Sequence, residues 1–151
     1  MPKEFRHKGL GFLYPDNWVL DEEEWLAGHR SVTVHAPGGG FWSVAFYPPE
    51  TDPQELAQTA VRTMQSEYKG VEAETVQETV AERELIGYDF AFFYLDFIVA
   101  AKIRCIRTDR FTLAVFCQAE DREFETIGPV FQAMTTSLVQ SIRPLRYDWP
   151  D

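Results

Sequence analysis

The stretch LIGYDFAFFYLDFI, Leu85–Ile98, decides the fold, because it is almost entirely apolar and carries six aromatic side chains. A strand that is apolar on both faces is typical of a sheet covered on both sides. We therefore interpret Leu85–Ile98 as a central strand, which implies helices on both faces of the sheet. The longest apolar run, Phe90–Ala101, is interrupted by Asp96 and is too short to span a bilayer as a helix.

Strand-like segments flank this stretch on both sides. Val71–Arg83 is rich in Thr, Val and Glu, which favours a charged strand protected from edge-to-edge association, although a helix remains open there. Ala100–Thr108 and Phe111–Ala119 follow as two further strands around a turn. We expect the strands between Phe90 and Val115 to be buried in the middle of the domain, without solvent on either face.

Two helices are predicted. Asp52 as N-cap, Pro53 at the first helical position and a capping-box Glu55 begin a helix that runs to about Lys69 and ends at Gly70. Apolar residues at intervals of three or four from Phe124 to Ile142 indicate a second, amphipathic helix. Pro129 inside it implies either a short turn followed by a helix that starts near Pro129, or one kinked helix.

The N-terminal part reads as β structure. Two short strands, Gly11–Tyr14 and Trp18–Asp21, surround a turn at Pro15-Asp16-Asn17. Ser31–Ala36 and Phe41–Tyr47 alternate cleanly and predict a hairpin whose facing pairs are Val32–Phe46, Val34–Val44 and Ala36–Trp42.

The expected element order is therefore β-β-β-β-α-β-β-β-β-α. This order predicts a single α+β domain over residues 1–151. Its architecture is an α/β/α sandwich with a central, mainly antiparallel sheet of about six or more strands and two main helices.

Three features of the sequence point to a known family. These are the motif Phe12-x-Tyr14-Pro15-x-x-Trp18, the order of strands and helices, and Ser137-Leu138 in the closing helix. In these features the chain resembles the PsbP-like superfamily. That superfamily includes PsbP, DcrB-type bacterial proteins and the Mog-type Ran-release factor, and the chain resembles a bacterial member of it. The resemblance implies the same α/β/α sandwich in an accessory or binding protein. It carries over no catalytic residue and no cofactor.

Charge excludes two classes of partner. The chain has 14 Lys and Arg against 24 Asp and Glu, a formal net charge of -10. Like charges would meet at a phosphate backbone or an anionic bilayer, so we expect neither nucleic acid nor a membrane as partner. No apolar stretch of signal-peptide length follows the N-terminus, and we expect a cytoplasmic protein.

The two cysteines are expected to be reduced and buried. A three-residue loop between their strands would place Cys105 opposite Leu113 and Cys117 opposite Ala101. Both thiols would then share one face, about four residues out of register, which is too far for a disulfide.

Catalytic and metal-binding patterns are weak. In the expected register His35 faces Ser43, so a hydrolase-type pair of nucleophile and base can be drawn, but neither an orienting acid nor an oxyanion hole is marked. A solvated strand face is the simpler interpretation. The histidines and acidic runs lack metal-ligand spacing, so we predict no metal and no cofactor.

A basic cluster gives one candidate binding site. Lys102 and Arg104 are expected to point away from the Cys105 side of their strand. A buried guanidinium needs a partner, so Arg104 either forms an internal ion pair or lines a pocket for a small anionic ligand. The ion-pair candidates are Asp89, Asp96 and the carboxylates of residues 120–125, and the walls of the pocket would be Tyr88 and Tyr94.

Exposed aromatic residues give another candidate, a protein-binding or self-association surface formed by Trp25, Phe41, Tyr47 and Trp149. The sequence thus favours a non-catalytic interaction or accessory module with a protein partner, and leaves a homodimer open. The alternative is small-anion binding at Lys102 and Arg104 or weak hydrolase activity at His35 and Ser43.

Overall fold

A computed structural model of the chain describes residues 1–142. Within them, a two-stranded sheet, β1-β2, accompanies a seven-stranded sheet in the order β3-β4-β5-β9-β8-β7-β6, and every ladder is antiparallel. The strands are β1 (Lys3–His7), β2 (Leu10–Tyr14), β3 (Val19–Asp21), β4 (Ser31–His35), β5 (Phe41–Tyr47), β6 (Glu72–Val80), β7 (Arg83–Tyr94), β8 (Phe97–Arg107) and β9 (Thr112–Glu120). The helices are α1 (Glu23–Leu26), α2 (Pro53–Glu67) and α3 (Asp121–Gln140).

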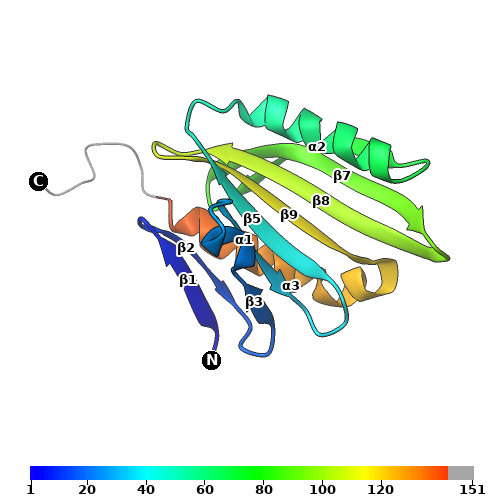
Figure 1. Ribbon diagram of the computed structural model, residues 1–151, viewed down its shortest axis with the longest axis horizontal. Helices are drawn as coiled ribbons and strands as arrows, with labels where there is room; N and C mark the ends of the chain where they lie inside the picture. The colour runs from blue at the N-terminus through cyan, green and yellow to red at the C-terminus, as the bar shows by residue number, and fades with distance from the viewer. Residues whose placement is uncertain (143–151) are drawn as a thin grey trace, which may run out of the picture.

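The two long helices lie on opposite faces of the large sheet (Figure 1). One core, which includes Trp42, Leu113 and Leu138, lies between the sheet, α3 and the small sheet. A second core, which includes Met64, Phe90 and Ile103, lies between the sheet and α2. The predicted α/β/α sandwich of two main helices around an antiparallel sheet is confirmed. β1 and the one-turn helix α1 are additional to the expected elements.

The ends of both long helices follow local chemistry. Asp52 accepts a hydrogen bond from the backbone amide of Gln54 at 3.0 Å, and Pro53 occupies the first turn, so the predicted start of α2 is confirmed. α2 ends at Glu67, two residues before the predicted end. α3 continues through Pro129 as one helix, which decides between the two alternatives.

Side-chain hydroxyls of α3 and its C-cap form hydrogen bonds with both sheets. The indole of the fully buried Trp42 donates to Thr135 Oγ1 at 3.0 Å. Ser137 and Ser141 each accept a backbone amide of β2, from Leu13 and from Gly11, at 2.9 Å. These bonds satisfy amides at the edge of β2, so the small sheet is held against α3 by hydrogen bonds as well as by apolar contact.

The register of the β4–β5 hairpin differs from the expected one by two residues. Val32 faces Val44 and Val34 faces Trp42. The chain turns within Pro37–Gly39 because Gly39 adopts φ 107° and the amide of Ala36 bonds to Gly40 O at 2.8 Å. A two-residue shift keeps the apolar residues on the same face, so the alternation alone did not reveal it.

The expected register of β8 and β9 is wrong by one residue. Cys105 faces Ala114 and Cys117 faces Lys102, so the thiols lie on opposite faces of the sheet. The cause is Thr108, whose Oγ1 accepts hydrogen bonds from the backbone amides of Arg110 and Phe111 at 3.1 and 3.0 Å. These bonds close a loop with an even number of residues in place of the expected three. The expectation that both cysteines are buried and unbridged is confirmed.

The predicted strand Leu85–Ile98 is instead divided by a turn. β7 ends at Tyr94, β8 begins at Phe97, and Leu95 between them adopts φ 56°. Leu-Asp is not a recognisable turn signal, which is why the sequence did not predict this break. The expectation of dry strands from Phe90 to Val115 is wrong here, since Phe93 and Leu95 are 68% and 78% exposed.

Candidate functional site

His35 and Ser43 are not opposite one another. In the observed register His35 faces Phe41, and Ser43 faces Thr33. His35 Nε2 lies 3.6 Å from Asp21 Oδ2, whereas Ser43 Oγ donates to Phe116 O at 3.4 Å. The expected facing of base and nucleophile is therefore corrected, and each side chain has a different partner.

Arg104 forms an internal ion-pair network. Its Nε donates to Glu78 Oε1 at 2.6 Å and its Nη2 to Asp89 Oδ1 at 2.7 Å. Its Nη1 donates to the backbone oxygens of Tyr88 and Ile103 at 3.1 and 3.0 Å. Burial alone would lower the pKa of Arg104, but the hydrogen bonds and the charges of Glu78 and Asp89 raise that pKa above its ordinary value.

The pairing of Arg104 with Asp89 is among the partners the sequence suggested, whereas Glu78 is not. Glu78 was missed because it belongs to β6, and only the β6–β7–β8 pairing brings it beside Arg104. Lys102 lies on the same face, with its Nζ 5.6 Å from the centre of the Phe124 ring. Of the two alternatives that the sequence left open for Arg104, an internal ion pair or an anion pocket, the guanidinium forms the ion pair, with two carboxylates.

The side chains of Tyr88 and Tyr94 lie on the opposite face of the sheet from Arg104 and Lys102. Tyr88 packs against the α2-side core, and Tyr94 meets Tyr68 of α2 edge-on at 5.9 Å. β7 and β8 pair so that Tyr88 faces Ile103, whereas Arg104 faces Gly87. The structure therefore does not bring together the four residues of the anion pocket that the sequence offered as an alternative.

The aromatic candidates separate into two groups. Trp25 is packed edge-on against Phe5 at 5.6 Å and Phe46 at 5.3 Å, on the α3 side of the sheet. Phe41 and Tyr47, at the two ends of β5, both lie on the α2 side. Trp149 lies outside the described residues.

Phe41 and Tyr47 line an apolar groove between α2 and the strands β5 and β9. Its volume is about 490 Å³. We call it the α2 groove. Its strand side is formed by Phe41, Ser43, Ala45, Tyr47, Ile103, Ala114, Phe116 and Gln118, and its helix side by Leu56, Thr59, Ala60, Thr63, Met64, Glu67 and Tyr68.

The groove exists because α2 covers only part of its face of the sheet. α2 contacts β7, β8 and β9, and β5 lies beside the helix (Figure 1). The odd-numbered residues of β5 therefore line the groove. On the helix, Leu56, Ala60 and Met64 recur every four residues and present one face to the strands. Nothing in the sequence showed which strand would lie below this face of the helix.

The groove carries little charge. Glu67, near the end of α2, is the one charged residue among those that line it. Burial, followed by the nearby Cys105, raises the pKa of Tyr47, so its hydroxyl stays protonated at neutral pH. The volume lies within the usual range of ligand sites, and the lining combines apolar walls with a few hydroxyl and amide groups.

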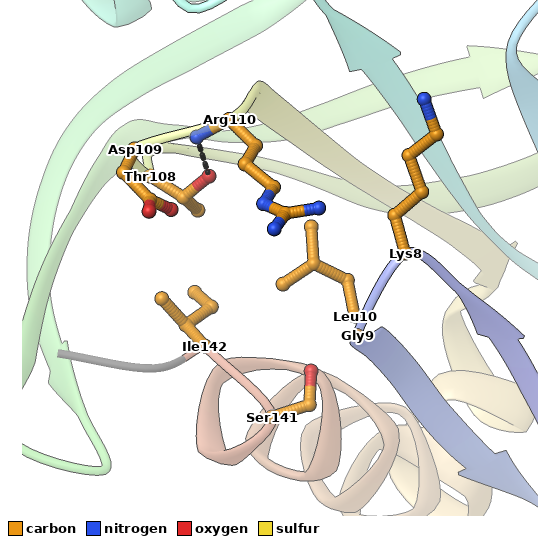
Figure 2. A pocket seen from close by; sticks show the side chains of 8 residues that line it. All are labelled: Lys8, Gly9, Leu10, Thr108, Asp109, Arg110, Ser141 and Ile142. Carbon is orange, nitrogen blue, oxygen red and sulfur yellow. Dashed lines mark hydrogen bonds between the residues drawn. The ribbon is translucent and has the colours of Figure 1, made fainter. Parts of the chain in front are cut away.

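A second pocket, of about 280 Å³, lies where the β1–β2 turn, the β8–β9 turn and the end of α3 meet (Figure 2). Figure 2 shows the guanidinium of Arg110 extending over Leu10, with Lys8 at the rim and pointing away. Thr108 and Ser141 also line the pocket, but their hydroxyls already donate hydrogen bonds to the backbone oxygens of Phe111 and Leu138. Asp109 also lines the pocket.

Within residues 1–142, no group of three or more His, Cys, Asp and Glu side chains could hold a metal ion. No helix in the same range is long and apolar enough to cross a bilayer.

Comparison with known proteins gives a result for the fold. No family model and no curated protein matches the sequence. Among solved structures, PA94 of Pseudomonas aeruginosa, a protein of unknown function, superposes with a TM-score of 0.60 and 10% identity over 95% of this chain and 98% of that one. Cyanobacterial PsbP from Synechocystis gives 0.60 and 15% over 90% of both chains. The Ran-binding protein Mog1p of Saccharomyces cerevisiae gives 0.55 and 11% over 94% of this chain and 92% of its own. The resemblance noted in the sequence is therefore confirmed at the level of architecture, and the chain has the PsbP/Mog1 fold.

Proposed function

We propose that the protein is a non-catalytic binding module that takes an apolar segment of a protein partner into the α2 groove. The observation that carries this proposal is the groove itself, an apolar concavity of about 490 Å³ that no element within residues 1–142 covers. Amphipathic segments bind such grooves through apolar side chains at regular spacing. Phe41 and Tyr47 supply the aromatic anchors that protein interfaces favour.

Charge specifies the partner further. Glu67 lines the groove, and the chain has a formal net charge of -10. A segment with positive residues beside its apolar ones would be attracted at long range and would place a cation near Glu67. The preferred partner segment is therefore apolar and basic.

The fold supports a binding role by analogy. Mog1p, with the same architecture, is a Ran-binding protein, so this fold can carry protein recognition. We also propose that the protein acts in the cytoplasm, a proposal that the two buried, free cysteines support because disulfides are rare in reducing compartments. We also propose that residues 1–151 form one domain, whose acidic surface disfavours nucleic acid and anionic membranes.

The test is site-specific photocrosslinking in the native cell. A photoreactive residue at Thr63, on the rim of the groove, should form an adduct with one protein, and Ala60→Arg in the same chain should abolish that adduct. Arginine keeps the helix propensity of α2 and fills the groove. The matched control places the photoreactive residue at Gln132, on α3. Equal adducts from both positions, or adducts that Ala60→Arg leaves unchanged, would contradict the proposal.

A second candidate function is small-anion binding, which the structure favours at the Arg110 pocket rather than at Arg104. Within residues 1–142, the Arg110 guanidinium has no carboxylate within salt-bridge distance, whereas Arg104 has two. Titration with inorganic phosphate should raise the melting temperature of the protein and leave Arg110→Gln unaffected. An equal response of the two proteins would exclude this pocket.

A further inference from the structure

The most unusual surface feature is the tip of the β7–β8 hairpin. Its large apolar side chains are exposed to the following extents: Phe93 68%, Tyr94 54%, Leu95 78%, Phe97 56% and Ile98 46%. We call Phe93–Ile98 the apolar arm. Contiguous apolar patches of this kind are uncommon on a monomer and mark interaction sites.

The arm extends beyond its neighbouring strands. β6 pairs with β7 only as far as Ala91, and β9 pairs with β8 only from Val99. Past these residues β7 and β8 pair with each other alone, through Phe93–Ile98 and Tyr94–Phe97. The arm therefore presents apolar side chains on both faces, over about 10 Å at ~3.3 Å per residue. In Figure 1 it forms the right-hand end of the sheet, where β8 begins.

The arm and the α2 groove are complementary in shape and polarity. The arm is convex and apolar, and its single charged residue is Asp96. The α2 groove is concave and apolar, and its single charged residue is Glu67. Along α2 the groove extends from Leu56 to Tyr68, about 18 Å at ~1.5 Å per residue, so an arm of about 10 Å fits along it. The arm cannot enter its own groove, because Tyr68 stacks on Phe92 at 4.2 Å and the sheet holds β7 in place.

The exposed area of the arm suits a contact between proteins. At about 200 Å² for a fully exposed large side chain, its five apolar residues expose roughly 600 Å². An interface that covered this area and an equal area of the partner would bury roughly 1,200 Å² in total, which is the lower end for specific interfaces. A reciprocal pair of contacts would bury twice that.

We propose that the apolar arm of one copy docks in the α2 groove of a second copy. The proposal goes beyond the proposed function because it needs no other protein, and it makes the arm a competitor of the partner segment. Asp96 and Glu67 would repel each other within the contact, and two chains of net charge -10 repel at long range. Added salt therefore strengthens the association, both by screening and by favouring apolar contact.

Sedimentation velocity of the full chain from micromolar to millimolar concentration tests the proposal. The wild type should self-associate, more strongly at higher salt. Phe93→Glu with Leu95→Asn in the arm, or Ala60→Arg in the groove, should each give a monomer. Leu95 has φ 56°, which asparagine tolerates, so Leu95→Asn alone preserves the turn and should weaken association in a folded protein. Leu26→Glu, at an 81% exposed site on α1, is the matched charge control and should associate like the wild type.

A mixing experiment identifies the two surfaces. The arm variant retains an intact groove and the groove variant retains an intact arm, so an equimolar mixture should form a complex that neither forms alone. A monomeric wild type at millimolar concentration, an associating arm variant, an associating groove variant or a mixture that stays monomeric would each overturn the proposal. Thr63 adducts that persist in the arm variant would show partner binding independently of self-association.

Discussion

Replacing Arg104 by methionine should destabilise the protein strongly, although the substitution keeps an apolar stem of similar shape. Arg104 is 6% exposed and donates to two carboxylates and two backbone oxygens. Its loss leaves Glu78 and Asp89 without the guanidinium that bonds to both of them. Removing one partner of a buried ion pair costs about 3–5 kcal/mol.

The cost here should lie at the lower end of that range. The side chains of Glu78 and Asp89 are 27% and 38% exposed, so water screens part of their repulsion. We expect the free energy of unfolding to fall by about 3 kcal/mol. In a domain of this size that corresponds to a melting temperature lower by about 6–12 °C. Urea denaturation followed by tryptophan fluorescence measures it, and the m-value should stay unchanged.

Two further variants separate charge from geometry. Arg104→Lys keeps the charge but loses the planar fork, and should cost about half as much as methionine. Combining Arg104→Met with Glu78→Gln and Asp89→Asn removes the uncompensated charges and should recover part of the lost stability. A cost below about 1 kcal/mol for Arg104→Met, or full stability of Arg104→Lys, would refute the reasoning.

Three other predictions concern the two cysteines, His7 and Gly87. Burial raises the pKa of Cys105 and of Cys117 from 9.0 to about 12. Both thiols should therefore react with iodoacetamide at pH 8 about a thousandfold more slowly than a model thiol, and alkylation at the model rate would disprove their burial. The stability that these protonated thiols contribute is complete below pH 9 and is lost as the pH rises toward 12. Burial, then Arg30 and Lys8, lowers the pKa of His7 below 6.5. The stability linked to neutral His7 is thus complete above pH 6.5 and is lost as the pH falls through the lowered pKa. In an NMR titration Arg30→Gln should raise that pKa, and an unchanged titration would contradict the role of Arg30. Finally, a Cβ at Gly87 would collide with the backbone oxygen of Ile103. Gly87→Ala should therefore cost about 3 kcal/mol in urea denaturation. Gly70→Asn, where a Cβ meets open space, should be nearly neutral, and equal stability of these two variants would count against the close approach.

Sequence reasoning was accurate where local chemistry decides. The N-cap and first-turn proline of α2 need only neighbouring residues, and so does the alternation of β4 and β5. The turn at Pro15 also follows from local pattern, and the Trp18 amide bonds to Pro15 O at 3.1 Å. In the structure the indole of Trp18 is buried and meets Phe131 at 5.7 Å. The aromatic motif therefore pointed to the correct fold.

The candidate sites were predicted less well, because each depends on strand register. A threonine-closed turn at Thr108 placed the two cysteines on opposite faces, and the tight turn at Gly39 moved His35 away from Ser43. Phe41 and Tyr47 were identified as surface aromatics, yet their shared groove appears only when α2 is placed beside β5. A shift of one residue inverts the faces of a strand, and hydrophobic pattern alone cannot detect it when both faces are apolar.

The amino-acid sequence by itself determined the α+β class, the two helices, the net charge of -10 and the burial of both thiols. Apolar period and helix capping act over a few residues, so they can be read without coordinates. Tertiary structure alone decided which carboxylates meet Arg104, where α2 leaves the sheet open, and that the hairpin tip stands beyond its neighbours. These features arise from contacts between residues far apart in the chain, and their geometry is set by how strands pair and helices pack.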